Sequence, residues 1–118
     1  MEINMDSILI SIKKLLGPTP EYEHFDPDII THINTAFFVL NQLGVGPDKP
    51  FSIKDDTAVW DDFMTSGDLE MVKTYIYEYV KRAFDPPSNS SHLNALKEDM
   101  KEMEWRLNVQ VDPGDDDV

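Results

Sequence analysis

The sequence predicts an all-α protein: a small four-helix bundle with a long irregular loop between the second and third helices and an extended C-terminal segment. Four segments place apolar residues three and four positions apart, which is the period of an amphipathic helix. Glycine, proline and short polar residues, which begin or end helices, flank these segments. The chain has 118 residues and 41% apolar content, which suits one globular domain. We expect this helical domain over residues 1–111 and an acidic tail over 112–118.

The first helix is expected over residues 6–16. Asp6 or Ser7 can serve as its N-cap, because a short polar side chain accepts a hydrogen bond from a free backbone N–H of the first turn. Lys13 lies near the end, where positive charge interacts favourably with the helix dipole. Gly17 follows and is expected to end the helix.

The second helix is expected from Asp26 to about Leu43, with Asp26 as its N-cap and Gly44 just beyond its end. Pro27 suits the first helical position, because the N–H that proline lacks would have no partner there. The apolar stripe is wide, so this helix is expected to be well buried. Its core positions are Ile33, Phe37 and Leu40.

Residues 44–67 form the least regular part of the chain. A loop of about twenty residues is unusual in a compact domain and commonly has a function. Phe51 and Ile53 lie on a short alternating piece that could be extended. The run Ala58-Val59-Trp60, together with Phe63, is apolar enough that we expect it to pin the loop onto the helical body.

The third helix is expected from near Asp68 to Phe84. Its core positions are Val72 and Ile76, within a stripe of Leu69, Val72, Ile76, Tyr79 and Ala83 that Tyr75 and Val80 widen. Tyr75, Tyr77 and Tyr79 lie on different faces of this helix and cannot all enter one core. At least one of them is therefore expected to be exposed or to meet another chain, since tyrosine is enriched at interfaces.

The fourth helix is expected from about Ser91 to Asn108. Its apolar residues are spaced 3, 4, 3 and 4 apart, which predicts a two-heptad seam against a helical partner. They are Leu93, Leu96, Met100, Met103 and Leu107. Beyond the helix, Val109 and Val111 flank Gln110, and this alternation predicts an extended piece.

The charge of the chain narrows the classes of partner. Ten Lys and Arg face 23 Asp and Glu, which gives a formal net charge of −13. Such a chain lacks the basic patch that neutralises nucleic-acid phosphates, and it is repelled by anionic membranes. The longest apolar run, residues 36–40, is far shorter than the roughly 20 residues of a membrane span. We therefore expect a soluble intracellular protein with no membrane partner.

No pattern predicts a catalytic or metal site, so we expect no enzyme and no cofactor. The chain has no Cys, and its three histidines are not spaced as zinc ligands. A calcium loop starting at Asp55 would need Gly and Glu at its sixth and twelfth positions, which hold Trp60 and Ser66. Glu98 and Glu102 could contribute to a magnesium site, but the third helix offers too few facing acids.

Five stretches, which together cover most of the chain, carry a resemblance. They are ILISIKKLLG (8–17), HFDPDIITHINTAFFVLNQLGVGP (24–47), FSIKDDTAVW (51–60), LEMVKTYIYEYVKRAFDPP (69–87) and EWRLNV (104–109). In content and order they resemble the small head–tail connector, or neck adaptor, proteins of tailed phages and prophages of Gram-positive hosts. The resemblance implies a structural virion protein in the neck, present in the host cytoplasm during assembly. It also implies a homo-oligomeric ring, commonly of twelve subunits, between the portal protein and the next neck or tail protein.

The resemblance also implies contact residues. The C-terminal segment would contact the portal, with the candidates Trp105, Leu107, Val109 and Val111. Contacts to a neighbouring subunit or the tail-side protein would fall on Phe51, Ile53, Trp60 and Tyr77. DNA would pass through the ring without sequence-specific binding, and an acidic lumen suits this because it repels the duplex.

Two other hypotheses remain open at this point. An acidic inhibitor or DNA mimic would use the same net charge of −13 to occupy a basic groove on another protein. A small magnesium-dependent enzyme is less consistent with the spacing of the acids. Particle size separates them, because a ring-forming protein builds a high-order oligomer and a mimic stays small.

Overall fold

The computed structural model describes residues 7–17, 23–65, 69–84 and 88–111, and it confirms the all-α class. The described residues form five helices and no strand. The helices are α1 (Ile8–Leu16), α2 (Asp26–Gln42), α3 (Trp60–Phe63), α4 (Leu69–Phe84) and α5 (Ser90–Val111). Four of them match the predicted helices, and the short α3 lies within the segment that was predicted to be irregular.

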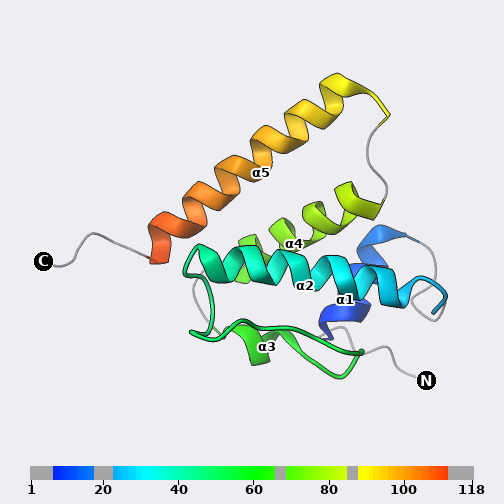
Figure 1. Ribbon diagram of the computed structural model, residues 1–118, viewed down its shortest axis with the longest axis vertical. Helices are drawn as coiled ribbons and strands as arrows, with labels where there is room; N and C mark the ends of the chain where they lie inside the picture. The colour runs from blue at the N-terminus through cyan, green and yellow to red at the C-terminus, as the bar shows by residue number, and fades with distance from the viewer. Residues whose placement is uncertain (1–6, 18–22, 66–68, 85–87, 112–118) are drawn as a thin grey trace, which may run out of the picture.

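The helices form a flat bundle organised around α4. Helix α2 packs along α4, α1 contacts both of them, and α5 packs against α4. Figure 1 shows α2 across the middle of the molecule, α5 along one edge, and the segment that carries α3 along the opposite edge. The core therefore lies between α2 and α4, and α5 covers only one side of it.

The core contains most of the predicted apolar positions. Fully buried side chains (0% exposed) on α2 and α4 include Ile33, Phe37, Leu40, Val72 and Ile76. On α5, Met100 and Leu107 are buried, Leu96 and Met103 are partly buried against the core, and Leu93 is half-exposed. The predicted seam of α5 thus packs along most of its length and opens toward the N-terminal end of the helix.

The buried face of α4 combines the predicted core positions with the two residues that were expected to widen the stripe. It consists of Val72, Tyr75, Ile76 and Val80. Tyr79 is only partly buried and Ala83 is exposed. The buried face is wide because α4 packs against α2, α1 and α5 together.

The junction of α1 and α2 corrects one predicted cap. Ser7 is the N-cap of α1, and its Oγ accepts a hydrogen bond from the N–H of Ile10 at 3.2 Å. Asp26, which was predicted to cap α2, is instead its first helical residue. Its carboxylate lies 2.7 Å from the ammonium of the buried Lys13. Lys13 lies near the negative C-terminal end of the α1 dipole, and Asp26 lies at the positive N-terminal end of the α2 dipole, so both charges are favourably placed. Asp26 does not cap α2 because its carboxylate binds Lys13.

The end of α5 corrects the prediction of an extended C-terminal segment. The helix continues through Val109 to Val111. Its packing explains this, because Leu107 is buried and the side-chain amide of Asn108 donates a 3.0 Å hydrogen bond to the carbonyl of Leu43. The alternation over 109–111 was too short to indicate a strand. The predicted acidic tail, residues 112–118, lies outside the described residues.

Candidate interaction surfaces

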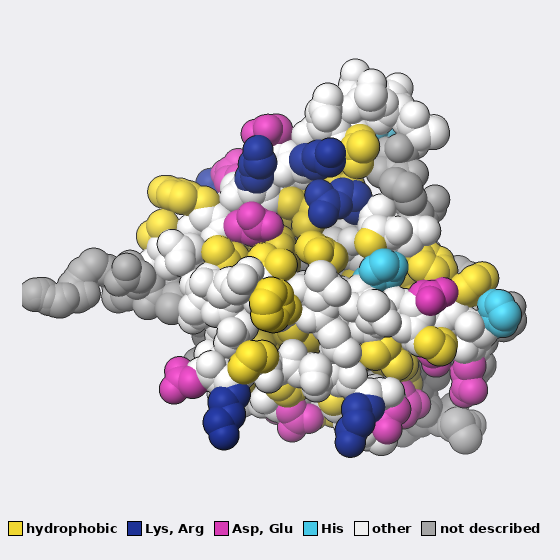
Figure 2. Space-filling view, viewed as in Figure 1, with side chains coloured by type: hydrophobic (Ala, Val, Ile, Leu, Met, Phe, Trp, Pro, Cys, Tyr) yellow, Lys and Arg dark blue, Asp and Glu magenta, His cyan; other side chains and the backbone are white. Residues whose placement is uncertain are grey.

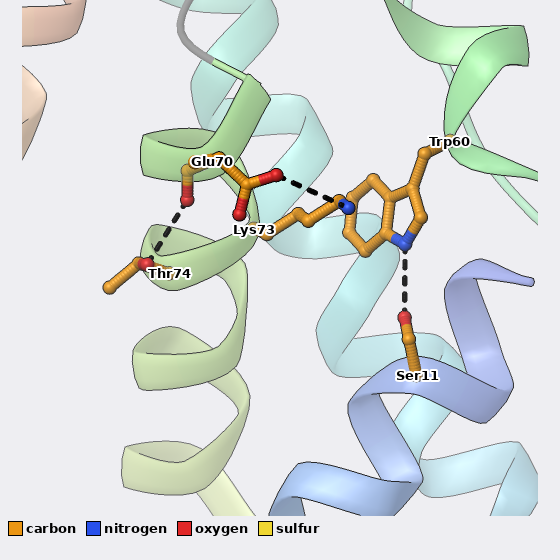
Figure 3. Close-up of polar contacts among 5 residues, drawn as sticks. All are labelled: Ser11, Trp60, Glu70, Lys73 and Thr74. Carbon is orange, nitrogen blue, oxygen red and sulfur yellow. Dashed lines mark hydrogen bonds and ion pairs between the residues drawn. The ribbon is translucent and has the colours of Figure 1, made fainter. Parts of the chain in front are cut away.

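Trp60 is a structural anchor within the subunit, at the start of α3. It is 3% exposed, and its indole N–H donates to Ser11 Oγ of α1 at 3.0 Å. The Lys73 ammonium of α4 lies 5.6 Å from the centre of the indole ring and 3.6 Å from Glu70 Oε2. Figure 3 shows the indole between α1 and α4, whereas the hydrogen bond from Thr74 to the Glu70 carbonyl lies on the side of α4 away from the ring. The indole is therefore not available on the surface of the subunit.

Ile53 is also held inside the subunit. Its side chain is 3% exposed, and its backbone makes two hydrogen bonds to the side-chain amide of Asn34 on α2. Asn34 Oδ1 accepts from the Ile53 N–H at 2.8 Å, and Asn34 Nδ2 donates to the Ile53 carbonyl at 3.0 Å. The amide thus replaces the strand partner that an extended segment needs. No sequence signal indicated this pairing, because an asparagine within a helix has no distinctive pattern.

The rest of the long loop packs against the same side of α2. The rings of Phe37, Phe51 and Phe63 lie 4.7–5.4 Å apart in a mutual cluster. Phe51 is only half-buried. Of the loop candidates for an intermolecular contact, Phe51 is therefore the one with accessible surface. The expected pinning of the loop by Trp60 and Phe63 agrees with their burial.

The described tyrosines of α4 are not left on the open surface. Tyr75 is fully buried, and its hydroxyl donates to Glu104 Oε2 of α5 at 2.7 Å. Burial, and then this hydrogen bond, raises the pKa of the Tyr75 hydroxyl above its usual range. Tyr77 and Tyr79 are half-buried against the core, and the Arg82 guanidinium lies 5.5 Å from the Tyr79 ring centre. Tyr77 and Tyr79 therefore keep part of their surface accessible, and contact of either with another chain stays a prediction.

The candidates for portal contact are divided between two faces of α5. Trp105 and Val109 are one helical turn apart and are 64% and 44% exposed. Leu107 is 2% exposed and faces the core, so it is not available on the subunit surface. The Val111 side chain lies outside the described residues. Arg106 holds Glu102 through Nε and Nη2 at 2.9 and 2.7 Å, which fixes polar side chains on the solvent side of the helix.

Other large apolar side chains on the surface lie outside these candidates. Phe38 of α2 is 52% exposed, and Leu15 of α1 is 56% exposed. Phe25 and Phe84 form an edge-to-face pair with ring centres 5.3 Å apart, at the N-terminal end of α2 and the C-terminal end of α4. Phe38 had no role predicted from the sequence, because it lies off the apolar stripe of α2.

An acidic depression of about 390 Å³ lies where the loop meets α2. Its lining residues are Leu9, Glu23, Asp26, Pro27, Ile30, Lys54, Asp55 and Asp56. The Thr57 hydroxyl donates to Asp55 Oδ1 at 2.6 Å, and this bond, with one from the Thr57 N–H, lowers the pKa of the Asp55 carboxyl. In the ranges that the structure describes, no three His, Asp or Glu side chains come together to hold a metal ion.

Comparison with protein families gives a match along almost the whole chain. Residues 8–114 match the family described as phage connector protein. The chain belongs to the phage connector protein family. The match includes all five helices and the loop that carries α3. Comparisons with curated proteins and with solved structures gave no match. Among the described residues, no helix is long and apolar enough to cross a bilayer.

Proposed function

We propose that this connector forms a ring below the portal protein, extends the DNA channel, and bridges the capsid to the next neck or tail protein. The observation that carries the proposal is the family match over residues 8–114. In this role the protein is a structural part of the virion neck and has no catalytic activity. The resemblance described above suggests twelve copies in the ring.

The outer face of α5 supports docking on the portal. Trp105 and Val109 expose apolar surface one turn apart, whereas the opposite face of the same helix holds Met100 and Leu107 in the core. A large aromatic residue on an exposed helix face is a typical anchor of a protein interface. We propose that the portal covers this part of α5, with Trp105 as its main contact.

The net charge supports passage of DNA without binding. The chain has 23 acidic residues against 10 basic residues. A ring of such subunits presents a negative potential to the phosphates of a duplex, and the same electrostatics that lets basic patches bind DNA makes acidic walls repel it. We propose that the duplex slides through the ring for this reason.

The test is binding to the purified portal, measured by size-exclusion chromatography and electron microscopy of the complex. We expect the native chain to form a ring on the portal and the variant Trp105→Ala, Val109→Asp to lose docking by about tenfold or more. Leu15→Asp is a matched control, because Leu15 is similarly exposed but lies on α1. Docking of the double variant at native affinity would contradict the assigned surface, and absence of docking by the native chain would contradict the function.

The acidic-mimic hypothesis makes a different prediction in the same experiment. It also rests on the net charge of −13. A mimic would remain a small particle in the presence of the portal and would bind a basic protein with an affinity that falls steeply as salt is added. That result would replace the connector proposal.

A further inference from the structure

From Thr31 onward, the outer face of α2 is an uncharged surface on a highly charged protein. Its exposed positions follow the helical period as Asp28, Thr31, Thr35, Phe38 and Gln42. Asp28 lies at the N-terminal end, where it complements the helix dipole. Residues 29–47 contain no Asp, Glu, Lys or Arg, although 28% of the whole chain is charged. The absence of charge from an exposed helix face therefore needs a physical reason.

The polar groups on this face are satisfied within the helix. Thr31 Oγ1 donates to the Pro27 carbonyl at 2.9 Å, and Thr35 Oγ1 donates to the Thr31 carbonyl at 3.0 Å. Because each hydroxyl has already used its proton, both side chains can be covered by another surface at a low desolvation cost. Phe38 adds a side chain that is 52% exposed. The face is thus prepared for contact with an uncharged surface.

The space-filling view shows how far this face extends. In Figure 2 the charged side chains gather along the edge formed by α4 and α5 and along the opposite edge formed by residues 44–65. The middle of this view, over α2, carries apolar and uncharged polar side chains and one histidine. Protein interfaces have the same arrangement, with a centre depleted of charge and a polar rim.

We infer that the outer face of α2, formed by Thr31, Thr35, Phe38 and Gln42, packs against a second copy of this chain. The inference deepens the proposed ring and rests on it. The charge of the chain favours a copy as the partner. Two subunits that each carry −13 repel wherever their acidic faces meet, and α2 offers a face where that repulsion is least. A basic partner would instead gain most from the acidic faces.

The size of the face predicts how strong the contact is. Thr31 to Gln42 spans about 17 Å of helix at roughly 1.5 Å per residue, which is the centre of an interface and not the whole of it. A stable interface buries about 800 Å² on each partner, so the flanking edges must contribute. Contacts in a ring are head-to-tail, so a different surface of the neighbouring copy covers α2. The contact between two free subunits should therefore be weak and visible at high concentration.

The test is sedimentation velocity of the isolated chain from about 10 μM to about 1 mM, without portal. We expect the mass of the native chain to rise with concentration, and both Phe38→Asp and Phe38→Lys to weaken association by about tenfold or more. The Asp variant increases the repulsion between subunits and the Lys variant decreases it. Loss of association in both variants would therefore show that Phe38 itself is buried in the contact. Asn94→Asp and Asn94→Lys are matched controls on an exposed position of α5 and should associate like the native chain. Circular dichroism checks that each variant is folded.

A second measurement uses the absence of cysteine from the chain. Thr35→Cys, labelled with a bulky maleimide, should lose association, and Asn94→Cys with the same label should keep it. The inference is overturned if the native chain stays monomeric at the highest concentration, or if the Phe38 variants and labelled Thr35→Cys associate normally. Loss of portal docking by Phe38→Asp, with no self-association of the native chain, would assign the face to the portal instead. In each of these cases docking through Trp105 and Val109 is scored separately, so the proposed function can stand when this inference fails.

Discussion

Helices α2 and α5 are both long, but they relate to the core in different ways. Over its 17 residues, α2 buries five side chains, packs on α4, and is covered on a second side by the loop that carries α3. Over its 22 residues, α5 buries only Met100 and Leu107 among its described side chains. The difference teaches that α1, α2, α4 and residues 43–65 form a body with its own core. Helix α5 is attached to that body along one side and leaves its other side exposed, which is the side proposed to contact the portal.

The polar contacts of the two helices show the same contrast. Asn34 of α2 binds the backbone of the loop through two hydrogen bonds. Helix α5 is joined to the body by the Tyr75–Glu104 hydrogen bond and by Asn108, which reaches the carbonyl at the end of α2. These few specific contacts orient α5, because the helix packs mainly against one other helix, α4. Its stability therefore depends more on single contacts than the stability of the body does.

The largest effect is expected in the body, at Phe37. Phe37→Ala removes a fully buried ring that contacts Phe51, Trp60 and Phe63, and should lower the free energy of unfolding by about 3–5 kcal/mol. The neighbouring Phe38→Ala is the control, since Phe38 is 52% exposed, and should cost less than about 1 kcal/mol. Urea unfolding followed by circular dichroism measures both. Equal losses would show that the two faces of α2 are equally buried, and the contrast with α5 would fail.

A smaller effect is expected at Gly46, which tests whether the loop belongs to the body. Gly46 has a φ of 90°, and a Cβ there would collide with the ring of Phe63. Gly17 has a φ of 135° but open space around a Cβ. Both alanine variants carry a backbone cost, and Gly46→Ala should lose about 1–3 kcal/mol more because of the overpacking. Thermal or urea unfolding gives the comparison, and equal stability of the two variants would mean that Phe63 moves freely.

The smallest effect is expected at the joint between α4 and α5. Tyr75→Phe removes the hydrogen bond to Glu104 and should cost about 1 kcal/mol at neutral pH. The pKa of Tyr75 is raised on folding from its usual 10.0, so the folded state holds this proton more tightly than the unfolded state. The resulting stability is complete below pH 10 and falls as the pH rises above it, by at most about 1.4 kcal/mol per pH unit.

The measurement is urea unfolding of the native chain and of Tyr75→Phe between pH 8 and pH 11. The native chain should lose stability above about pH 10 more steeply than the variant, which lacks the titrating hydroxyl. Parallel pH dependence of the two proteins would show that the Tyr75 hydroxyl reaches solvent and that α5 is held mainly by Met100 and Leu107.

The local features of the fold were predictable because they depend on near neighbours in the chain. The period of the apolar residues predicted four helices, and the structure has a helix at each place. Ser7 caps α1 as expected, and Gly44 follows α2 with a positive φ of 83°. The predicted N-cap Asp26 was wrong because its carboxylate has a distant partner, Lys13. Local patterns cannot reveal a partner that lies on another helix.

The residues available for intermolecular contact could not be identified from local patterns either. The sequence predicted that Trp60 pins the loop and, through the resemblance, also made it a contact candidate, whereas Phe38 had no predicted role. The structure encloses Trp60 between Ser11 and Lys73 and leaves Phe38 52% exposed. The uncharged run at 29–47 was visible in the sequence, but its meaning depends on knowing which face of α2 points outward.

The sequence by itself determined the all-α class, the positions of the long helices, the acidic charge and the resemblance to connector proteins. These properties are local or additive, so they do not require knowledge of how the helices pack. Only the tertiary structure decided which apolar residues lie in the core and which stay exposed on the surface. Packing decides this because a helix has more than one apolar stripe, and only the surrounding elements determine which stripe they cover.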